Sequence, residues 1–561
     1  MSAATLDRPW LKSYPEGVPA DIDASAYPSL VALMEESFGQ YRDRVAYSFM
    51  GKSVTFAQID QLSLALGAYF QSLGLVQGDR VAIMMPNVPQ YPVAVAATLR
   101  AGLVVVNVNP LYTPRELEHQ LKDSGARAIV IIENFAHTLE QCIGSTPVKH
   151  VVLCAMGDQL GLLKGAVVNF VVRSVKKMVP AFLLPGAIPF KDAVARGRRA
   201  QLQRPTVRPD DIAVLQYTGG TTGVSKGAVL LHRNVIANVL QSEAWNAPAM
   251  TSLPPDTQVV YVCALPLYHI FAFTVNMMLG MRTGAKNILI PNPRDFAAVL
   301  HELSRHQIHT FPAVNTLFNG LANHADFNKV DWSHLKVSLG GGMAVTSAVA
   351  ALWLKKTGCP ICEGYGLSET SPSASCNPTN SKAFTGTIGV PIPSTWFKLL
   401  DDDGNEVAPG QAGEIAIKGP QLMAGYWQRP DETAKVMTPD GYFKSGDIGV
   451  LDDQGFFKII DRKKDMILVS GFKVYPNEVE EVVTMLDGVL ECACVGVADD
   501  QSGEAVRLVI VKKNPSLTEA QVREYCKTKL TGYKQPKVVE FRADLPKTPV
   551  GKILRRELRT T

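Results

Sequence analysis

The stretch that decides the fold is Tyr217-Thr-Gly-Gly-Thr-Thr-Gly-Val-Ser-Lys-Gly227. It contains four glycines, several hydroxyl side chains and one lysine, and it has little apolar surface to bury. Glycine lets successive backbone N–H groups turn toward one point, while the hydroxyls and the Lys226 ammonium add donors and positive charge. This composition favours a loop that binds a polyphosphate over a surface loop without a ligand.

The flanking sequence predicts how this loop is held. Residues 212–217 form an apolar run typical of a strand, and residues 234–242 have the pattern of a helix. A strand, a glycine-rich loop and a helix form a common phosphate-binding unit. The residue order differs from a Walker loop, because Lys226 precedes Gly227 and no Ser or Thr follows it.

Length and composition are those of a large folded protein. The 561 residues suggest several subdomains, and a net charge of +4 gives no whole-chain reason to expect nucleic acid as a partner. Nine scattered cysteines favour free thiols in a reducing compartment. Residues 1–10 lack the apolar stretch of a signal peptide, and no run reaches the roughly 18 apolar residues of a membrane span. We therefore expect a cytoplasmic protein.

The hydrophobic pattern divides the chain into a large and a small part. Between residues 27 and 132, helical and strand patterns alternate, which indicates parallel βαβ units. Residues 386–460 contain short strands separated by turns, which is typical of an antiparallel β region. A charged run at 461–465 then precedes a stretch with an α+β pattern. The predicted fold class is α/β: a large N-terminal domain of α/β subdomains plus a β region (1–460), a hinge (461–464) and a small mobile α+β C-terminal domain (465–561).

Residues 161–190 depart from this alternation. Apolar side chains, mostly valines, are interspersed there with Lys164, Arg173, Lys176 and Lys177. A basic amphipathic segment of this kind can lie on an anionic membrane surface, and the protein would then be a peripheral membrane protein. The same pattern fits a helix that packs on the domain and leaves its lysines in water. The sequence leaves both interpretations open.

A second motif, Glu363-Gly-Tyr-Gly-Leu-Ser-Glu-Thr370, follows a predicted strand. Within it, Tyr365 can stack on a base and Thr370 can donate a hydrogen bond to an α-phosphate. Glu369 can bind a magnesium ion through its carboxylate. The motif therefore suits a nucleotide, although a structural turn would have a similar composition.

Three other positions are candidates for the same site. Asp447 stands between glycines at the edge of a predicted strand, where a carboxylate suits two ribose hydroxyls. The glycines of 340–343 permit close backbone approach to a flat ligand. His269 lies in an apolar run and, taken alone, is typical of a buried core histidine.

Taken in order, these stretches resemble one known family. Five separated stretches are similar in order and spacing to the adenylate-forming superfamily of acyl-CoA synthetases, luciferases and peptide synthetases: the loop 217–227, Tyr365 to Thr370, Asp447, residues 461–471, and Lys552. Three phrases more specifically resemble the bacterial long-chain fatty acid CoA ligases: Pro110-Leu-Tyr-Thr-Pro-Arg-Glu-Leu-Glu118, Asp461-Arg-Lys-Lys-Asp-Met-Ile-Leu-Val-Ser-Gly471 and Val474-Tyr-Pro-Asn-Glu478. The match runs nearly from end to end.

The resemblance implies a role for each matching residue. The catalytic residues would be Lys552, Glu369, His269 and Thr370, with Lys552 bridging the carboxylate and the α-phosphate and Glu369 binding Mg2+. The loop would bind the β- and γ-phosphates of ATP, Tyr365 and Gly341 would border adenine, and Asp447 with Arg462 would hold the ribose. The full set of implied ATP- and AMP-binding residues is Thr218, Gly219, Gly220, Thr221, Thr222, Gly223, Ser225, Lys226, Gly341, Gly342, Tyr365, Gly366, Asp447 and Arg462.

Four further roles concern the second substrate and the acyl chain. The resemblance implies that Lys464 occupies the hinge position and that Gly471 lies beside the path of CoA. It also implies that His269 lies near the acyl and thioester site, and that Phe273 is a gate to the acyl tunnel.

The implied activity is that of a long-chain fatty acid–CoA ligase. Fatty acid and ATP, with Mg2+ as cofactor, would give acyl-AMP and pyrophosphate, and CoA would then take the acyl group to give an acyl-CoA for fatty acid degradation and lipid metabolism. Three alternatives remain open: a medium-chain or aryl acid CoA ligase, a ligase that loads a carrier protein, and a membrane-associated fatty-acid binding or uptake protein. The expected partners are these substrates and no nucleic acid, and peripheral membrane contact and a homodimer are further expectations.

Overall fold

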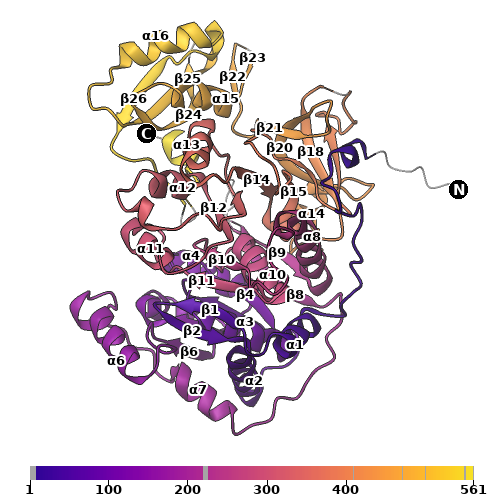
Figure 1. The fold of residues 1–561 in the computed structure, drawn as a ribbon, viewed down its shortest axis with the longest axis vertical. Helices are drawn as coiled ribbons and strands as arrows, with labels where there is room; N and C mark the ends of the chain where they lie inside the picture. The colour runs from indigo at the N-terminus through magenta and orange to yellow at the C-terminus, as the bar shows by residue number, and fades with distance from the viewer. Residues whose placement is uncertain are drawn as a thin grey trace, which may run out of the picture.

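A computed structural model describes residues 8–218, 225–408, 410–470, 472–499, 501–548 and 551–559. Within them the chain forms two large mixed sheets, a smaller antiparallel sheet and a C-terminal sheet. Figure 1 shows the C-terminal part as a separate unit beyond α12 and α13, with the antiparallel sheet beside it. The predicted α/β class, with a large N-terminal part and a small C-terminal part, is confirmed.

The first large sheet is built around a parallel core. Strands β4, β3, β5 and β6 pair in parallel, and the apolar run of β5 is buried along its whole length, as expected for a strand covered on both faces. In spatial order the sheet contains β19 (Gly425–Tyr426), β9 (Lys226–Leu231), β8 (Ile212–Thr218), β4 (Val104–Asn107), β3 (Arg80–Met84), β5 (Ala128–Ile132), β6 (His150–Cys154) and β7 (Ile188–Pro189).

The second large sheet is also parallel at its centre, from β11 through β10, β12 and β13 to β14. Its antiparallel strands lie at the two ends. In spatial order it contains β16 (Val390–Pro391), β15 (Ser373–Cys376), β14 (Ile361–Gly366), β13 (Val337–Gly340), β12 (Thr310–Ala313), β10 (Val260–Cys263), β11 (Lys286–Leu289), β1 (Val45–Phe49) and β2 (Lys52–Thr55).

The two remaining sheets follow each other in sequence. The predicted antiparallel β region is confirmed as four strands: β17 (Trp396–Leu400), β18 (Gly413–Lys418), β20 (Phe443–Leu451) and β21 (Phe457–Arg462). The C-terminal sheet contains β23 (Phe472–Val474), β22 (Ile467–Val469), β25 (Gly503–Lys512), β24 (Val489–Asp499) and β26 (Val538–Arg542). The chain leaves one sheet at Arg462 and enters the other at Ile467.

Helices surround the sheets. They are α1 (Leu30–Gln40), α2 (Phe56–Ser72), α3 (Gln90–Arg100), α4 (Pro114–Ser124), α5 (Ala136–Glu140), α6 (Leu162–Phe170), α7 (Phe190–Gly197), α8 (His232–Met250), α9 (Ile270–Ala272), α10 (Leu279–Thr283), α11 (Phe296–Leu303), α12 (Asn315–Ala322), α13 (Ser347–Thr357), α14 (Pro430–Val436), α15 (Pro476–Thr484), α16 (Glu519–Lys529) and α17 (Arg555–Arg559). Two short π-helical segments, Val171–Val175 and Phe273–Met278, continue α6 and α9. Among the helices of the described residues, none combines the length and apolar character needed to cross a bilayer.

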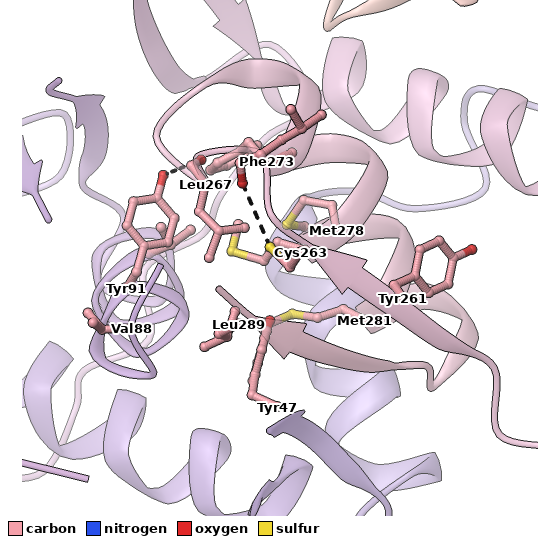
Figure 2. Packing of buried hydrophobic residues seen from close by; sticks show 14 of the residues in the cluster. Tyr47, Val88, Tyr91, Tyr261, Cys263, Leu267, Phe273, Met278, Met281 and Leu289 are labelled. Atoms are coloured by element: carbon pink, nitrogen blue, oxygen red, sulfur yellow. Dashed lines mark hydrogen bonds between the residues drawn. The ribbon is translucent and has the colours of Figure 1, made fainter. Parts of the chain in front are cut away.

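Helix α3 shows why the core forms where it does. All of its residues are buried, and the sequence there is rich in alanine and valine. A helix that is apolar on all sides can be stable only when it is enclosed, and small side chains let its neighbours approach closely. Figure 2 shows Tyr91 of α3 beside Leu267 and Phe273, and the Tyr91 hydroxyl donates to the Leu267 carbonyl at 2.8 Å. The helix therefore joins the first half of the chain to the second large sheet.

The prediction that a helix directly follows the phosphate loop is wrong, because a strand lies between them. Residues 226–231 form a strand, β9, that pairs antiparallel with β8, with Thr218 opposite Lys226. The predicted helix exists as α8, but it begins at His232 after that strand. The apolar run Gly-Ala-Val-Leu-Leu after Lys226 is long enough to form a strand, but it has no alternating pattern that distinguishes a strand from the start of the helix. The loop thus connects two strands of a hairpin, and no helix N-terminus follows it directly.

Candidate active site

A continuous hollow of about 3090 Å³ contains most of the residues predicted to bind nucleotide. Both the large N-terminal part and the small C-terminal part contribute residues to its wall. The predicted residues that line it are Thr218, Ser225, Lys226, His269, Gly341, Gly342, Tyr365, Gly366, Glu369, Asp447, Arg462, Lys464 and Lys552. The predictions for Gly219, Gly220, Thr221, Thr222, Gly223 and Gly471 lie outside the described residues.

One corner of the hollow is centred on Asp447. This residue lies on β20 opposite Arg462 on β21, and the Arg462 Nε is 2.9 Å from Asp447 Oδ1. The Tyr365 hydroxyl donates to Asp447 Oδ2 at 2.6 Å. Burial and the nearby carboxylate raise the pKa of Tyr365, so its hydroxyl keeps the proton that it donates. Each carboxylate oxygen retains acceptor capacity for a further hydroxyl group.

Glu369 lies in the short 3-10 turn Ser368–Thr370, which follows β14. The Tyr426 hydroxyl donates to Glu369 Oε1 at 2.8 Å, and burial raises the pKa of the Glu369 carboxyl. No group of three or more potential metal-binding side chains occurs among the described residues. A single carboxylate facing the hollow nevertheless fits Mg2+, because this ion commonly binds one or two carboxylates together with substrate phosphates and waters.

Thr370 and Gly366 fix the shape of this loop. The Thr370 hydroxyl donates to the Pro372 carbonyl and accepts from the Leu367 N–H at 2.9 Å, so it faces its own loop and does not line the hollow. A Cβ on Gly366 would lie 1.8 Å from the Pro372 carbonyl oxygen, which leaves glycine as the only residue that fits without moving the backbone.

The stem of the phosphate loop is anchored on both strands. The Ser225 hydroxyl donates to the Thr218 carbonyl at 2.6 Å, which ties β8 to the residue before β9. The Tyr217 hydroxyl donates to Asp123 Oδ2 at 2.7 Å. The Lys226 ammonium forms an ion pair with the Glu432 carboxylate and lies 5.3 Å from the centre of the Tyr426 ring. The charge that a phosphate would need is therefore already neutralised by a carboxylate.

Lys552 enters the hollow from the C-terminal part of the chain. Its N–H donates to Thr548 Oγ1 at 3.0 Å, and a Cβ on Gly551 would lie 2.7 Å from Thr316 Oγ1 of α12, so this segment rests on the N-terminal part. Burial, assisted by the positive charges of Arg462 and Lys464, lowers the pKa of Lys552 to about 7. A bound anion would raise this pKa again and favour the charged form of the Lys552 side chain.

His269 lies close enough to Lys552 to respond to its charge. Burial, assisted by the Lys552 charge, lowers the pKa of His269 to about 4, so the imidazole is neutral near pH 7. Its Nδ1 accepts from the Phe271 N–H at 3.4 Å. The histidine that looked like a core residue in the sequence therefore lines the hollow.

The structure does not bring Phe273 to this site. Its side chain is fully buried in the core of Figure 2, near Leu267 and Met278, and it does not line the hollow. Phe271 lines the hollow instead, and a Cβ on Gly341 would lie 2.8 Å from its ring. The aromatic wall is thus provided by a residue two positions before the predicted gate.

The family models match both parts of the chain. A model described as AMP-binding enzyme matches residues 34–427, and one described as AMP-binding enzyme C-terminal domain matches residues 478–552. The chain belongs to the AMP-binding enzyme family. The predicted resemblance to adenylate-forming enzymes is therefore confirmed.

Relatives of this AMP-binding enzyme match it over almost its whole length. A long-chain-fatty-acid–CoA ligase of Escherichia coli O6:H1 is 54% identical over 555 residues, which is 99% of this chain and 98% of that protein. ATP-bound MatB from Rhodopseudomonas palustris is 27% identical, with a TM-score of 0.81 over 94% of this chain and 98% of that one. Apo MatB from the same organism covers the same shares at the same identity, with a TM-score of 0.71. The arrangement of the chain is thus more similar to the ATP-bound form.

Three residues of this AMP-binding enzyme's site were not predicted from the sequence. Tyr426 and Glu432 contact Glu369 and Lys226, and both come from the segment around α14, which has no motif of its own. Arg555 is buried in ion pairs with Glu480 and Asp465, three residues after Lys552. The basic run at the C-terminus includes Arg555. The sequence does not show, however, whether a basic residue of that run is enclosed by carboxylates or exposed to water.

Proposed function

We propose that this enzyme is a long-chain fatty acid–CoA ligase that forms acyl-CoA, AMP and pyrophosphate from a fatty acid, ATP and CoA. The observation that carries the chemistry is the meeting of Lys552, Asp447 and Lys226 in one hollow. The long-chain substrate is favoured by the similarity, over nearly the full length, to a protein described as a long-chain-fatty-acid–CoA ligase. Both steps require the same acyl adenylate to remain bound.

In the first step the fatty acid carboxylate attacks the α-phosphorus of ATP. The bond from that phosphorus to the bridging oxygen breaks, and pyrophosphate leaves. Two anions must approach each other, so positive charge is needed where the new negative charge develops, and Lys552 and Lys226 supply it. Mg2+, held by Glu369 and the phosphates, would neutralise further negative charge.

The other residues of the hollow bind and orient the nucleotide in this proposal. The stem residues Thr218, Ser225 and Lys226 hold the β- and γ-phosphates together with the loop between them. Asp447 accepts from the ribose hydroxyls, and Arg462 keeps its carboxylate in place. The base lies between Tyr365 and the glycines, since Gly341, Gly342 and Gly366 leave room for a flat ring.

In the second step the CoA thiolate attacks the acyl carbonyl, and AMP leaves. We propose that the C-terminal part turns about residues 461–464 between the steps, so that Lys552 withdraws and Gly471 approaches the path of CoA. Asp461 stands at the joint: it lies on β21 and accepts from the Asn477 N–H of α15 at 2.8 Å. One buried carboxylate therefore links the two parts across the predicted hinge.

A panel of acids tests the proposed substrate class. Acetate, benzoate, decanoate and oleate would each be supplied with ATP, CoA and Mg2+, and both AMP release and thioester formation would be measured. We expect the highest kcat/KM for oleate and no activity in excess EDTA. A maximum at acetate, benzoate or decanoate would indicate a ligase of a short-chain, aryl or medium-chain acid. Formation of acyl-AMP and pyrophosphate without AMP release or thioester would indicate a carrier-protein ligase. Fatty acid binding without pyrophosphate release would indicate an uptake protein.

The proposed location follows from the same chemistry. Nine free cysteines are present and all are buried, which suits a reducing cytoplasm. A long-chain fatty acid dissolves in bilayers, so peripheral contact with the inner face of the membrane would bring the enzyme to its substrate. Fractionation of cells that produce the full chain would test this location.

A further inference from the structure

Exposed apolar side chains gather on one segment of the molecule. Of the fifteen large apolar side chains that are strongly exposed in the described part of the chain, seven lie between residues 162 and 183. They are Leu162, Leu163, Val167, Phe170, Val175, Met178 and Leu183, and the two leucines of the first turn are 88% and 87% exposed. Scattered apolar side chains on a surface are ordinary, but a contiguous group marks an interaction surface. We call these seven residues the 162–183 surface.

Helix α6 presents its apolar face outward. Gly165 is the only buried residue of the helix, and a Cβ on it would lie 2.4 Å from the Gly157 carbonyl oxygen. Asn169, one turn later, accepts from the Gly157 N–H at 2.7 Å through its Oδ1. The inward face is thus made by Gly165, Asn169 and Val168, which is partly buried against the core. Leu163, Val167 and Phe170 share the opposite face, because they follow the helical spacing of four and three residues.

An ordinary surface helix buries its apolar stripe, whereas α6 packs one valine inward and exposes four large apolar side chains. Figure 1 shows α6 at the margin of the molecule, outside the helices that cover the first sheet. The helix and its π-helical continuation span only residues 162–175, which at 1.5 Å per residue is too short to cross a bilayer. The segment can therefore lie on a membrane but cannot span it.

The charge of the segment selects the type of partner. Between residues 159 and 191 there are five basic residues and no acidic one. Lys176 and Lys177 are exposed beside Val175 and Met178. Two neighbouring carboxylates neutralise basic residues of this segment: Glu133 pairs with Arg173 at 2.8 Å and Asp158 with Lys191 at 3.6 Å. Glu140 is engaged with the Leu183 N–H and with His137. Lys176 and Lys177 form no ion pair with the described residues, so they supply the exposed positive charge of the segment.

We propose that the 162–183 surface binds an anionic phospholipid bilayer. The outward apolar side chains enter the boundary between headgroups and acyl chains, and the lysines lie at the lipid phosphates. A second copy of this chain is a poorer fit, because a symmetric contact would place the same positive charges against each other. Binding of the bilayer by this surface does not rest on the proposed ligase activity. A role of the surface in collecting fatty acid from the bilayer does rest on it.

Cosedimentation of the full chain with vesicles tests this proposal. Wild type would be mixed with vesicles of phosphatidylcholine alone or with one quarter phosphatidylglycerol, at low and high salt. We expect binding to the anionic vesicles and loss of most of it at high salt. Leu163→Gln/Phe170→Gln and Lys176→Gln/Lys177→Gln should each lower the partition coefficient by about tenfold. Val76→Gln/Val538→Gln, which changes two exposed apolar residues elsewhere, should bind like wild type.

Several outcomes would overturn the proposal. They are a wild type that stays in the supernatant with anionic vesicles, and a Leu163→Gln/Phe170→Gln variant that binds normally. A third is a wild-type dimer that this variant converts to monomer in sedimentation velocity, because the surface would then bind a second copy. Thioester formation from dissolved decanoate is measured in parallel and should be unchanged in all variants. If wild type formed no thioester from any acid of the panel, the ligase proposal would be refuted and the vesicle result would still be valid.

Discussion

The corner around Asp447 and the segment around Lys552 form two walls of one hollow, but they are stabilised differently. At the corner, the carboxylate receives Arg462 on one oxygen and the Tyr365 hydroxyl on the other, and two of these residues are paired on adjacent strands. Lys552 instead comes from a loop that rests on α12, and burial together with the nearby cations lowers its pKa. One wall is complete without a substrate, whereas the other gains stability when an anion arrives.

This difference suggests how one hollow can serve two reactions. Groups whose charges are balanced within one sheet stay in place throughout, so they can hold the nucleotide during both steps. A lysine among cations is poorly stabilised until negative charge is bound, and it can leave once that charge departs with pyrophosphate. The experiments below test whether the two walls differ in this way.

Lys552→Ala should have the largest effect and should affect only one half of the chemistry. We expect fatty-acid-dependent pyrophosphate release to fall by about 10²- to 10³-fold, because the variant lacks the positive charge at the α-phosphate. Thioester formation from supplied acyl-AMP should be largely retained. Lys529→Ala on α16 is the control. Near-normal adenylation by the variant would show that Lys552 is not the catalytic lysine.

Lys464→Pro should produce the opposite pattern. Proline in the turn that follows β21 restricts the backbone rotation on which the second step depends. We expect adenylation within a few-fold of wild type and thioester formation lowered by about 100-fold. Lys464→Ala, which keeps the backbone free, should carry out both steps. Equal loss of both steps in the proline variant would argue against rotation about this turn.

Asp447→Asn should impair the fixed wall. The substitution weakens the contact to Arg462 and the acceptor for Tyr365, and we expect kcat/KM for ATP to fall by about 100-fold in adenylation. Tyr365→Phe removes only one hydrogen bond and should cost about tenfold. Thermal unfolding distinguishes a lost nucleotide contact from a disrupted sheet. Identical kinetics for both variants would mean that the ion pair to Arg462 contributes nothing beyond the tyrosine.

The pH dependence of adenylation should report the protonation of Lys552. The protonated form of Lys552 supplies the charge, and its pKa is lowered from the ordinary value near 10.5 to about 7. The kcat/KM for adenylation should therefore be level below pH 7 and decline by about tenfold per pH unit above it. Bound ATP should shift the fall in kcat to higher pH, since its negative charge favours the ammonium. The alkaline limb should be absent in Lys552→Ala.

Glu432→Gln should have the smallest effect and should increase affinity. The carboxylate competes with phosphate for the Lys226 ammonium, so its neutralisation should lower the Kd for ATP by about threefold. Glu406→Gln, in the antiparallel region, serves as the control for titration calorimetry. A raised Kd would mean that Glu432 holds Lys226 in position and does not compete with the nucleotide.

The sequence predicted the elements with strong periodicity and the order of the motifs. Helices α2 and α4 begin after Thr55 and Thr113, whose side chains cap them, and β5 is an unbroken run of apolar residues within the stretch where alternating helices and strands were predicted. These features depend on local sequence, so one chain is enough to recognise them. The predicted site residues from Thr218 to Lys552 line the same hollow. This could be predicted because their motifs resemble a family in which these motifs form one site.

The errors concern contacts that depend on long-range geometry. The strand β9 was missed because a run of six residues between a loop and a helix has no periodicity to identify it. Phe273 and Phe271 cannot be ranked from sequence, since which ring faces the hollow depends on the π-helical turn that follows. Glu432 contacts Lys226 across 206 residues, and no local signal indicates that pairing.

The hairpin of β8 and β9 has a consequence for how this family can diversify. Both ends of the glycine-rich loop are held in one sheet, and Ser225 closes the stem below it. Residues in the loop can therefore change, or their number can change, while the strands that carry them stay paired. Selection for a different polyphosphate or a different rate of release can act on the loop without altering the stability of the domain.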